Sequence, residues 1–63
     1  MKLKDYRMSK NLTQEDLSKL LGIQRTTISM WEKNRAKPRL DMVFKLSRVL
    51  EVDVAVIGRI FSY

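Results

Sequence analysis

A chain of 63 residues and 7.5 kDa has room for one domain with a small hydrophobic core. The sequence contains neither cysteine nor histidine, which excludes disulfides and the usual zinc ligands and removes the commonest general base. We therefore expect a protein that is not an enzyme and that needs no metal, cofactor or small-molecule ligand. Thirteen basic residues against seven acidic ones leave a net charge of +6, which indicates either a polyanionic partner such as nucleic acid or a solubilising surface.

The charge is unevenly distributed along the chain. Residues 24–39 carry five basic side chains and one acidic one, whereas residues 40–63 carry three of each. The longest apolar run, Val54–Ile57, is far shorter than the roughly 20 residues of a membrane span, and the charged amino terminus does not resemble a signal peptide. We expect a soluble cytoplasmic chain with no membrane partner.

Helical periodicity divides the sequence into about five short helices. The first contains Leu3 and Tyr6 and is expected to end near Asn11, a residue that tolerates a left-handed backbone. The second begins after Thr13, which can cap a helix amino terminus, and ends at Gly22. The apolar stripe of the second helix is predicted to consist of Leu17, Leu20 and Leu21.

The third helix begins between Gln24 and Thr26, buries Ile28 and Trp31, and ends near Asn34. A loop follows because proline at position 38 lacks an amide donor and favours an extended residue before it. The fourth helix is predicted to place six residues inward: Leu40, Val43, Phe44, Leu46, Val49 and Leu50.

The last segment allows two interpretations. Asp53 can cap a fifth helix that contains Val56, Ile57 and Ile60. The same β-branched residues, together with Gly58, would also suit a short strand. With a fifth helix, the sequence predicts an all-α fold, a compact bundle that forms a single domain over residues 1–63.

The span from residue 12 to residue 31 has the pattern of a helix-turn-helix. Gly22 can adopt the positive φ of a tight turn, and Ser18 is small enough for the following helix to approach closely. Apolar residues fill the space between the two helices. An ordinary pair of antiparallel helices is the alternative, but it gives no reason for basic charge to gather around the second helix.

The residues of this span resemble the lambda-repressor-like helix-turn-helix family of phage repressors and Cro proteins. The resemblance covers about residues 3–57 and rests on Leu12–Leu17, Leu20–Ile23, Thr27–Ser29, Trp31, Glu32, Pro38 and Leu40. It implies a five-helix all-α domain that binds operator DNA, usually as a dimer. The sequence departs from the family in having Asn34-Arg35 and Glu51 where glycine is frequent, and Arg39 where a serine cap is common.

The amino end of the third helix reaches base edges in this mode of docking. Arg25 is the best residue for reading a guanine, with a plain phosphate contact as the alternative. The predicted base-reading set is Gln24, Arg25, Thr26, Ser29 and Met30. Thr26 can meet a thymine methyl group, whereas Met30 could also be an exposed residue without a role.

The resemblance makes Gln14, at the start of the second helix, a phosphate-binding residue. The full predicted phosphate set is Gln14, Thr27, Asn34, Arg35 and Lys37, with packing at the helix crossing as the alternative for Thr27. The resemblance also implies that Arg7 and Glu32 form a structural ion pair between the first and third helices.

We predict a sequence-specific regulator of transcription, most simply a Cro-like repressor that binds a palindromic operator in double-stranded DNA as a homodimer, at the nucleoid. Residues 52–63 are the expected dimerisation segment, with Ile60, Phe61 and Tyr63 at the interface; alternatively these residues fold back and complete the core of one copy. The alternative functions are an antitoxin or accessory subunit of a two-protein complex, or a nonspecific RNA or nucleoid binder.

Overall fold

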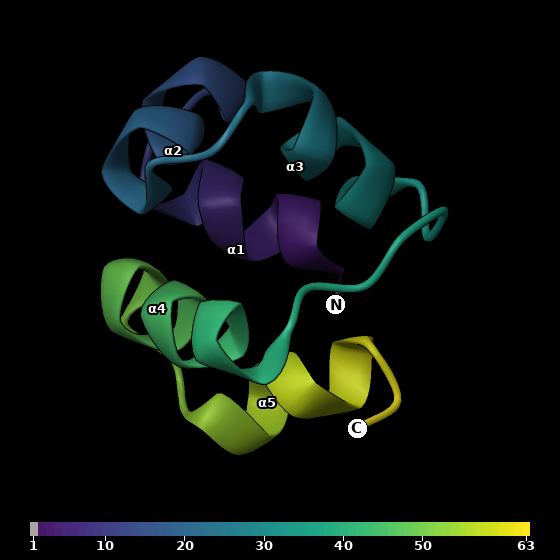
Figure 1. Cartoon of the computed structure of the whole chain (residues 1–63). Helices are drawn as coiled ribbons and strands as arrows, with labels where there is room; N and C mark the ends of the chain where they lie inside the picture. Colours follow the sequence, from purple (N-terminus) through teal and green to yellow (C-terminus); the bar gives the residue numbers. More distant parts are fainter. Residues whose placement is uncertain (1) are drawn as a thin grey trace.

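The computed structural model describes residues 2–63 and contains five helices joined by short turns (Figure 1). In chain order these are α1 (Leu3–Ser9), α2 (Gln14–Leu21), α3 (Arg25–Glu32), α4 (Leu40–Leu50) and α5 (Val54–Ile60). No strand occurs among the described residues, which confirms the all-α prediction. Helices α1, α2 and α3 form one half of the molecule, and α4 and α5 form the other (Figure 1).

Left-handed residues end the helices at the predicted places. Asn11, Gly22 and Asn34 have φ angles of 58°, 71° and 58°, as expected from residue types that tolerate this conformation. In each turn the next amide donates to the carbonyl five residues earlier, as when Ile23 N donates to Ser18 O at 3.0 Å. This bond satisfies a carbonyl that the helix itself leaves free.

Glu51 ends α4 in the same left-handed conformation, with φ of 56°, although it carries a side chain where glycine would be unstrained. Its carboxylate forms an ion pair with Lys10 Nζ, which joins the end of α4 to the end of α1. Glutamate in place of the family's glycine therefore strains the backbone at this position but does not alter the turn.

Side-chain caps begin two of the helices as predicted. At the start of α2, Thr13 Oγ1 accepts from Asp16 N, and Asp16 Oδ2 accepts from Thr13 N, both at 3.0 Å. These bonds lower the pKa of Asp16, the backbone amide of Thr13 being the main cause and its hydroxyl the next. Asp53 Oδ1 accepts from Ala55 N at 2.9 Å at the start of α5.

All five helices contribute to one core, whose buried apolar residues are Leu3, Leu17, Leu21, Ile28, Trp31, Val43, Leu46, Leu50, Ile57 and Phe61. The prediction that Leu20, Leu40 and Phe44 point inward was wrong, because their exposed fractions are 59%, 58% and 55%. On α4, Phe44 lies about 100° around the helix axis from its buried neighbour Val43, so its side chain lies outside the buried face of the helix.

The carboxyl-terminal segment forms the helix α5, which resolves the earlier choice between helix and strand. Phe61 is only 3% exposed and belongs to the core, so the prediction that it is free to meet a second copy was wrong. Ile60 is half-buried against the core, and Tyr63 is exposed. The fold-back alternative therefore describes Phe61 correctly. None of the helices within residues 2–63 combines the length with the apolar composition that a membrane crossing requires.

Candidate nucleic-acid interface

Helices α2 and α3 pack against each other across the turn at Gly22 (Figure 1). Leu17 and Leu21 of α2 and Ile28 and Trp31 of α3 are all buried between the helices and the rest of the core. Ser18, also buried, donates its hydroxyl to the carbonyl of Glu15 at 2.7 Å, so the close approach leaves no unsatisfied polar group there. This arrangement presents the outer side of α3 to solvent.

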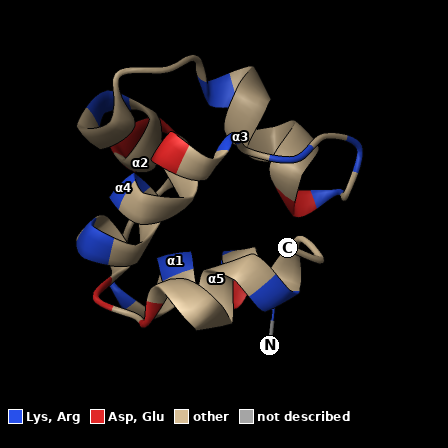
Figure 2. Ribbon diagram, turned by 60° about the horizontal axis from the view of Figure 1, so that its bottom comes forward, with Lys and Arg blue, Asp and Glu red and all other residues tan. Residues whose placement is uncertain are grey.

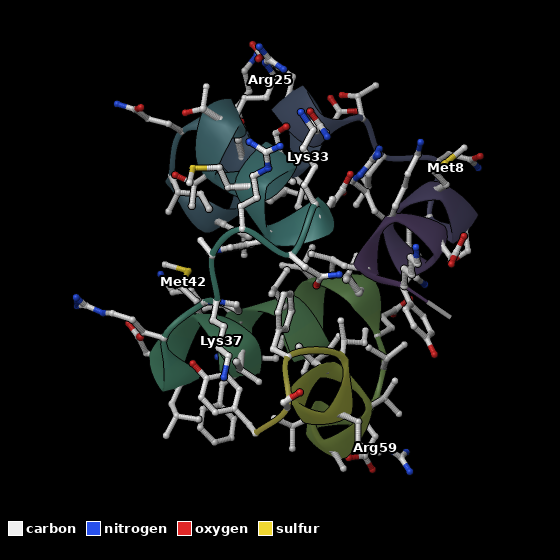
Figure 3. All side chains as sticks on the ribbon, turned by 90° about the vertical axis from the view of Figure 1, so that its right-hand side faces the viewer. Met8, Arg25, Lys33, Lys37, Met42 and Arg59 are labelled. Carbon is white, nitrogen blue, oxygen red and sulfur yellow. The ribbon has the colours of Figure 1, made fainter. Side chains whose placement is uncertain are left out.

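The outer side of α3 carries the predicted base-reading residues. Gln24, Arg25, Thr26 and Met30 are exposed, while Ser29 and Thr27 are half-buried. Arg25 stands at the amino end of α3, at an outer corner of the molecule (Figure 3). The predicted base-reading residues thus lie on one accessible side of α3, with Ser29 half-buried. Thr27, which belongs to the predicted phosphate set, is half-buried as well.

A chain of hydrogen bonds connects Arg25 with the interior. Arg25 Nη1 donates to Gln14 Oε1 at 3.4 Å, and Gln14 Nε2 donates to Glu32 Oε1 at 3.0 Å. Glu32 in turn accepts from Arg7, at 2.6 Å from Nε and at 3.2 Å from Nη2. The side chains of Arg7 and Glu32 are 8% and 6% exposed, so this bidentate ion pair is buried.

The third bond of Arg7 anchors the turn between α1 and α2, because Nη1 donates to the carbonyl of Leu12 at 2.6 Å. Glu32 thereby fixes two groups at once: the guanidinium of Arg7 and the amide of Gln14. Since Glu32 takes the amino side of that amide, the carbonyl oxygen of Gln14 faces Arg25. The family resemblance predicted the Arg7–Glu32 pair, which the structure contains, but gave no sign that the hydrogen bonds continue to Gln14 and Arg25.

A groove of about 600 Å³ lies beside the start of α2. Lys4, Arg25 and Gln14 line it together with Met8, and the positive end of the α2 dipole adjoins it. Lys4 was not among the predicted site residues, and the structure places it beside Gln14 and Arg25 in this groove.

The loop between α3 and α4 is rich in basic residues, which are blue on the ribbon of Figure 2. Asn34, Arg35 and Lys37 of the predicted phosphate set are all exposed. Lys33, which that set omitted, is exposed on the same side of the molecule as Arg25 (Figure 3). Lys37 extends away from Arg25, toward α4 and α5, and its Nζ lies 5.2 Å from the centre of the Tyr63 ring.

Helix α3 has an exposed basic amino end, packs against α2 across the turn at Gly22 and is followed by a basic loop. Together these features define a helix-turn-helix DNA-binding domain. The helix-turn-helix family model HTH_3 matches residues 3–57, and the chain belongs to this family. Its members are DNA-binding regulators of transcription, so the protein is not an enzyme.

Relatives named as transcriptional regulators share this domain. An uncharacterized HTH-type transcriptional regulator of Methanocaldococcus jannaschii is 47% identical over 84% of this chain and 80% of its own. The HTH-type transcriptional activator BcrR of Enterococcus faecalis is 38% identical over 84% of this chain, which covers 26% of BcrR. The cryptic phage CTXphi transcriptional repressor RstR of Vibrio cholerae is 32% identical over 86% of this chain and 49% of its own. No solved structure gives a significant match.

Proposed function

We propose that this protein is a sequence-specific repressor that binds a palindromic operator in double-stranded DNA as a homodimer. The observation that carries the proposal concerns Arg25. Its side chain is exposed at the amino end of α3, and its Nη1 donates a hydrogen bond to Gln14 Oε1 at 3.4 Å. A guanidinium held in one direction suits bidentate recognition of guanine O6 and N7. Such a contact discriminates against the wrong base by about 1–3 kcal/mol.

The rest of the base-reading surface consists of neutral side chains around Arg25: Gln24, Thr26, Ser29 and Met30. Thr26 can contact a thymine methyl group, and Gln24 can form two hydrogen bonds with an adenine. Ser29 and Met30 lie one turn further along α3 and border these contacts.

The residues proposed to bind phosphates, on both sides of the DNA groove that α3 enters, are Gln14, Thr27, Asn34, Arg35 and Lys37. Gln14 is supported by its place at the positive end of α2, above a groove that Lys4 and Arg25 also line. Asn34, Arg35 and Lys37 belong to the exposed loop after α3, which is positioned to follow the DNA backbone without reading sequence.

Dimerisation is proposed through an apolar patch on α4 and α5, made up of Leu40, Phe44, Val54, Ala55 and Tyr63. Leu40, Phe44 and Tyr63 are more than half exposed, and a shallow hollow of about 430 Å³ runs between Leu40, Val54, Ala55 and Tyr63. Of the residues first expected at the interface, Tyr63 remains in this proposal, whereas Ile60, half-buried beside Tyr6 and Val56, and the buried Phe61 leave it. A second copy is the proposed occupant because one copy, 25 × 22 × 20 Å, is too small to span half-sites about 34 Å apart.

Repression is supported by the similarity to RstR, which is named as a repressor. A bound protein can repress simply by occupying a promoter. BcrR, named as an activator, carries additional sequence outside the matched region, since this chain covers only 26% of its length. Binding in the cytoplasm, at the nucleoid, follows from the proposed DNA target.

Operator affinity measured against salt concentration, with the mass of the complex from sedimentation, tests this proposal. Arg35 and Lys37 on phosphates in both subunits predict a slope of log affinity against log salt of about −3.6. A slope near zero would contradict the DNA-binding surface. A chain that stays monomeric and binds DNA only with a second protein would contradict the homodimer and favour an accessory subunit of a two-protein complex.

A further inference from the structure

The loop between α3 and α4 has little backbone support where it carries Lys37. Arg35 N donates to Met30 O at 2.9 Å, and α4 begins with Val43 N donating to Arg39 O at 2.9 Å. Within the part of the chain that the structure describes, no backbone amide of residues 36–39 donates to another backbone group. The stretch is held instead by side-chain contacts, among them the packing of Pro38 and Ala36 against the core.

Tyr63 supplies two of these contacts from the far end of the chain. Its hydroxyl donates to the carbonyl of Pro38, a fully buried residue, and its ring lies below Lys37 Nζ at 5.2 Å from the ring centre. Because a hydrogen bond and a cation–π contact meet on one side chain, the ring fixes both the path of the loop and the place of the ammonium group.

The turn after α5 aims Tyr63 at the loop. Ser62 has a left-handed φ of 63°, and Tyr63 N donates to Gly58 O at 2.8 Å, the bond that closes a helix end of this kind. Phe61, buried in the core two residues before Tyr63, anchors the same turn. The backbone of Tyr63 is thus held by α5 and the core.

We propose that Tyr63 is a positioning residue for DNA binding, which holds Lys37 ready for a phosphate through its contacts with Lys37 and the neighbouring Pro38. The proposal rests on the phosphate role of Lys37 proposed above. An aromatic ring suits this task because it holds a cation without neutralising it, whereas a carboxylate would cancel the charge that the phosphate needs. The ammonium group has three N–H donors, so its side away from the ring stays available to the DNA.

A double-mutant cycle tests the proposal with Tyr63→Leu, which removes the ring but remains apolar, and Lys37→Met, which removes the charge but keeps a long side chain. Loss of a pre-ordered side chain is expected to weaken operator binding by about 2- to 10-fold per subunit in Tyr63→Leu. Tyr63→Phe keeps the ring under Lys37 and should lose less. In the Lys37→Met background, Tyr63→Leu should cause no further loss.

Tyr63 also belongs to the apolar patch on α4 and α5, so thermal unfolding and sedimentation are measured on the same variants. A loss of affinity in Tyr63→Leu that persists undiminished in the Lys37→Met background would overturn the proposal, because it would come from stability or dimerisation. Lys37→Met that binds the operator as tightly as the parent would overturn it too, by removing Lys37 from the phosphate set. A parent chain that binds no operator at all would instead refute the proposed function.

Discussion

Glu32→Ala tests whether the buried ion pair supports the fold as well as the DNA-binding surface. The substitution leaves Arg7 with a side chain only 8% exposed, still bonded to the carbonyl of Leu12, and without its carboxylate partner. Removing one member of a buried pair costs about 3–5 kcal/mol. A domain of this size has a free energy of unfolding of about 3–9 kcal/mol, at roughly 0.05–0.15 kcal/mol per residue. We therefore expect Glu32→Ala to remove about a third or more of the stability.

Urea denaturation followed by tryptophan fluorescence measures this change directly. Trp31 is the single tryptophan, is buried in the core and directly precedes Glu32. Glu15→Ala is the matched control, because the Glu15 carboxylate lies 4.0 Å from Lys19 and both side chains are well exposed. We expect that control to cost about 1 kcal/mol or less. Similar losses in the two variants, both near 1 kcal/mol, would refute the reasoning and make Glu32 an ordinary surface charge.

Three further substitutions test separate parts of the structure. Asp16 has a lowered pKa in the folded chain, so its stabilising effect is complete above its unfolded pKa of about 3.9 and disappears as pH falls through the lower folded value. The difference in melting temperature between the parent and Asp16→Asn should therefore shrink as pH falls from 5 to 2, and a constant difference would contradict the cap. Glu51→Gly removes the strain of a left-handed residue that carries a side chain, but it also removes the exposed ion pair with Lys10. We expect the free energy of unfolding, measured by urea denaturation, to rise by about 0.5–1 kcal/mol. A decrease would mean that the ion pair outweighs the strain. Phe44→Lys places a charge in the apolar patch and should yield monomers by sedimentation that still unfold cooperatively, whereas an unchanged dimer would move the interface elsewhere.

Features that depend on neighbouring residues could be predicted from the sequence. Thr13 and Asp53 cap helices because a short oxygen-bearing side chain reaches the amides of its own first turn. Asn11, Gly22 and Asn34 end helices because these residue types tolerate a positive φ. The pattern from residue 12 to residue 31 consists of such local signals, and they were sufficient to predict the helix-turn-helix.

Features that depend on how the helices pack could not be predicted in the same way. Leu20 and Phe44 fit the helical period, but the edge of a buried arc is set by the neighbouring helices and not by spacing. Phe61 was expected at the surface, and it fills the core because it lies four residues after the buried Ile57 on the same face of α5, a relation that holds only if this segment is a helix. The contact of Gln14 with both Glu32 and Arg25 joins residues 18 and 11 positions apart, and no pattern along the chain signals such a junction.

Selection of binding sites from random double-stranded DNA, with the parent and with Arg25→Ala, tests the central claim that the amino end of α3 reads sequence. We predict that the parent selects a palindrome with half-sites one helical turn apart. Arg25→Ala should lose the preference for one base pair in each half-site, by about 1–3 kcal/mol, and keep the others. Lys37→Ala is the matched control, which should weaken binding and select the same site. An unchanged selected sequence for Arg25→Ala, or no selected sequence for the parent, would contradict the account.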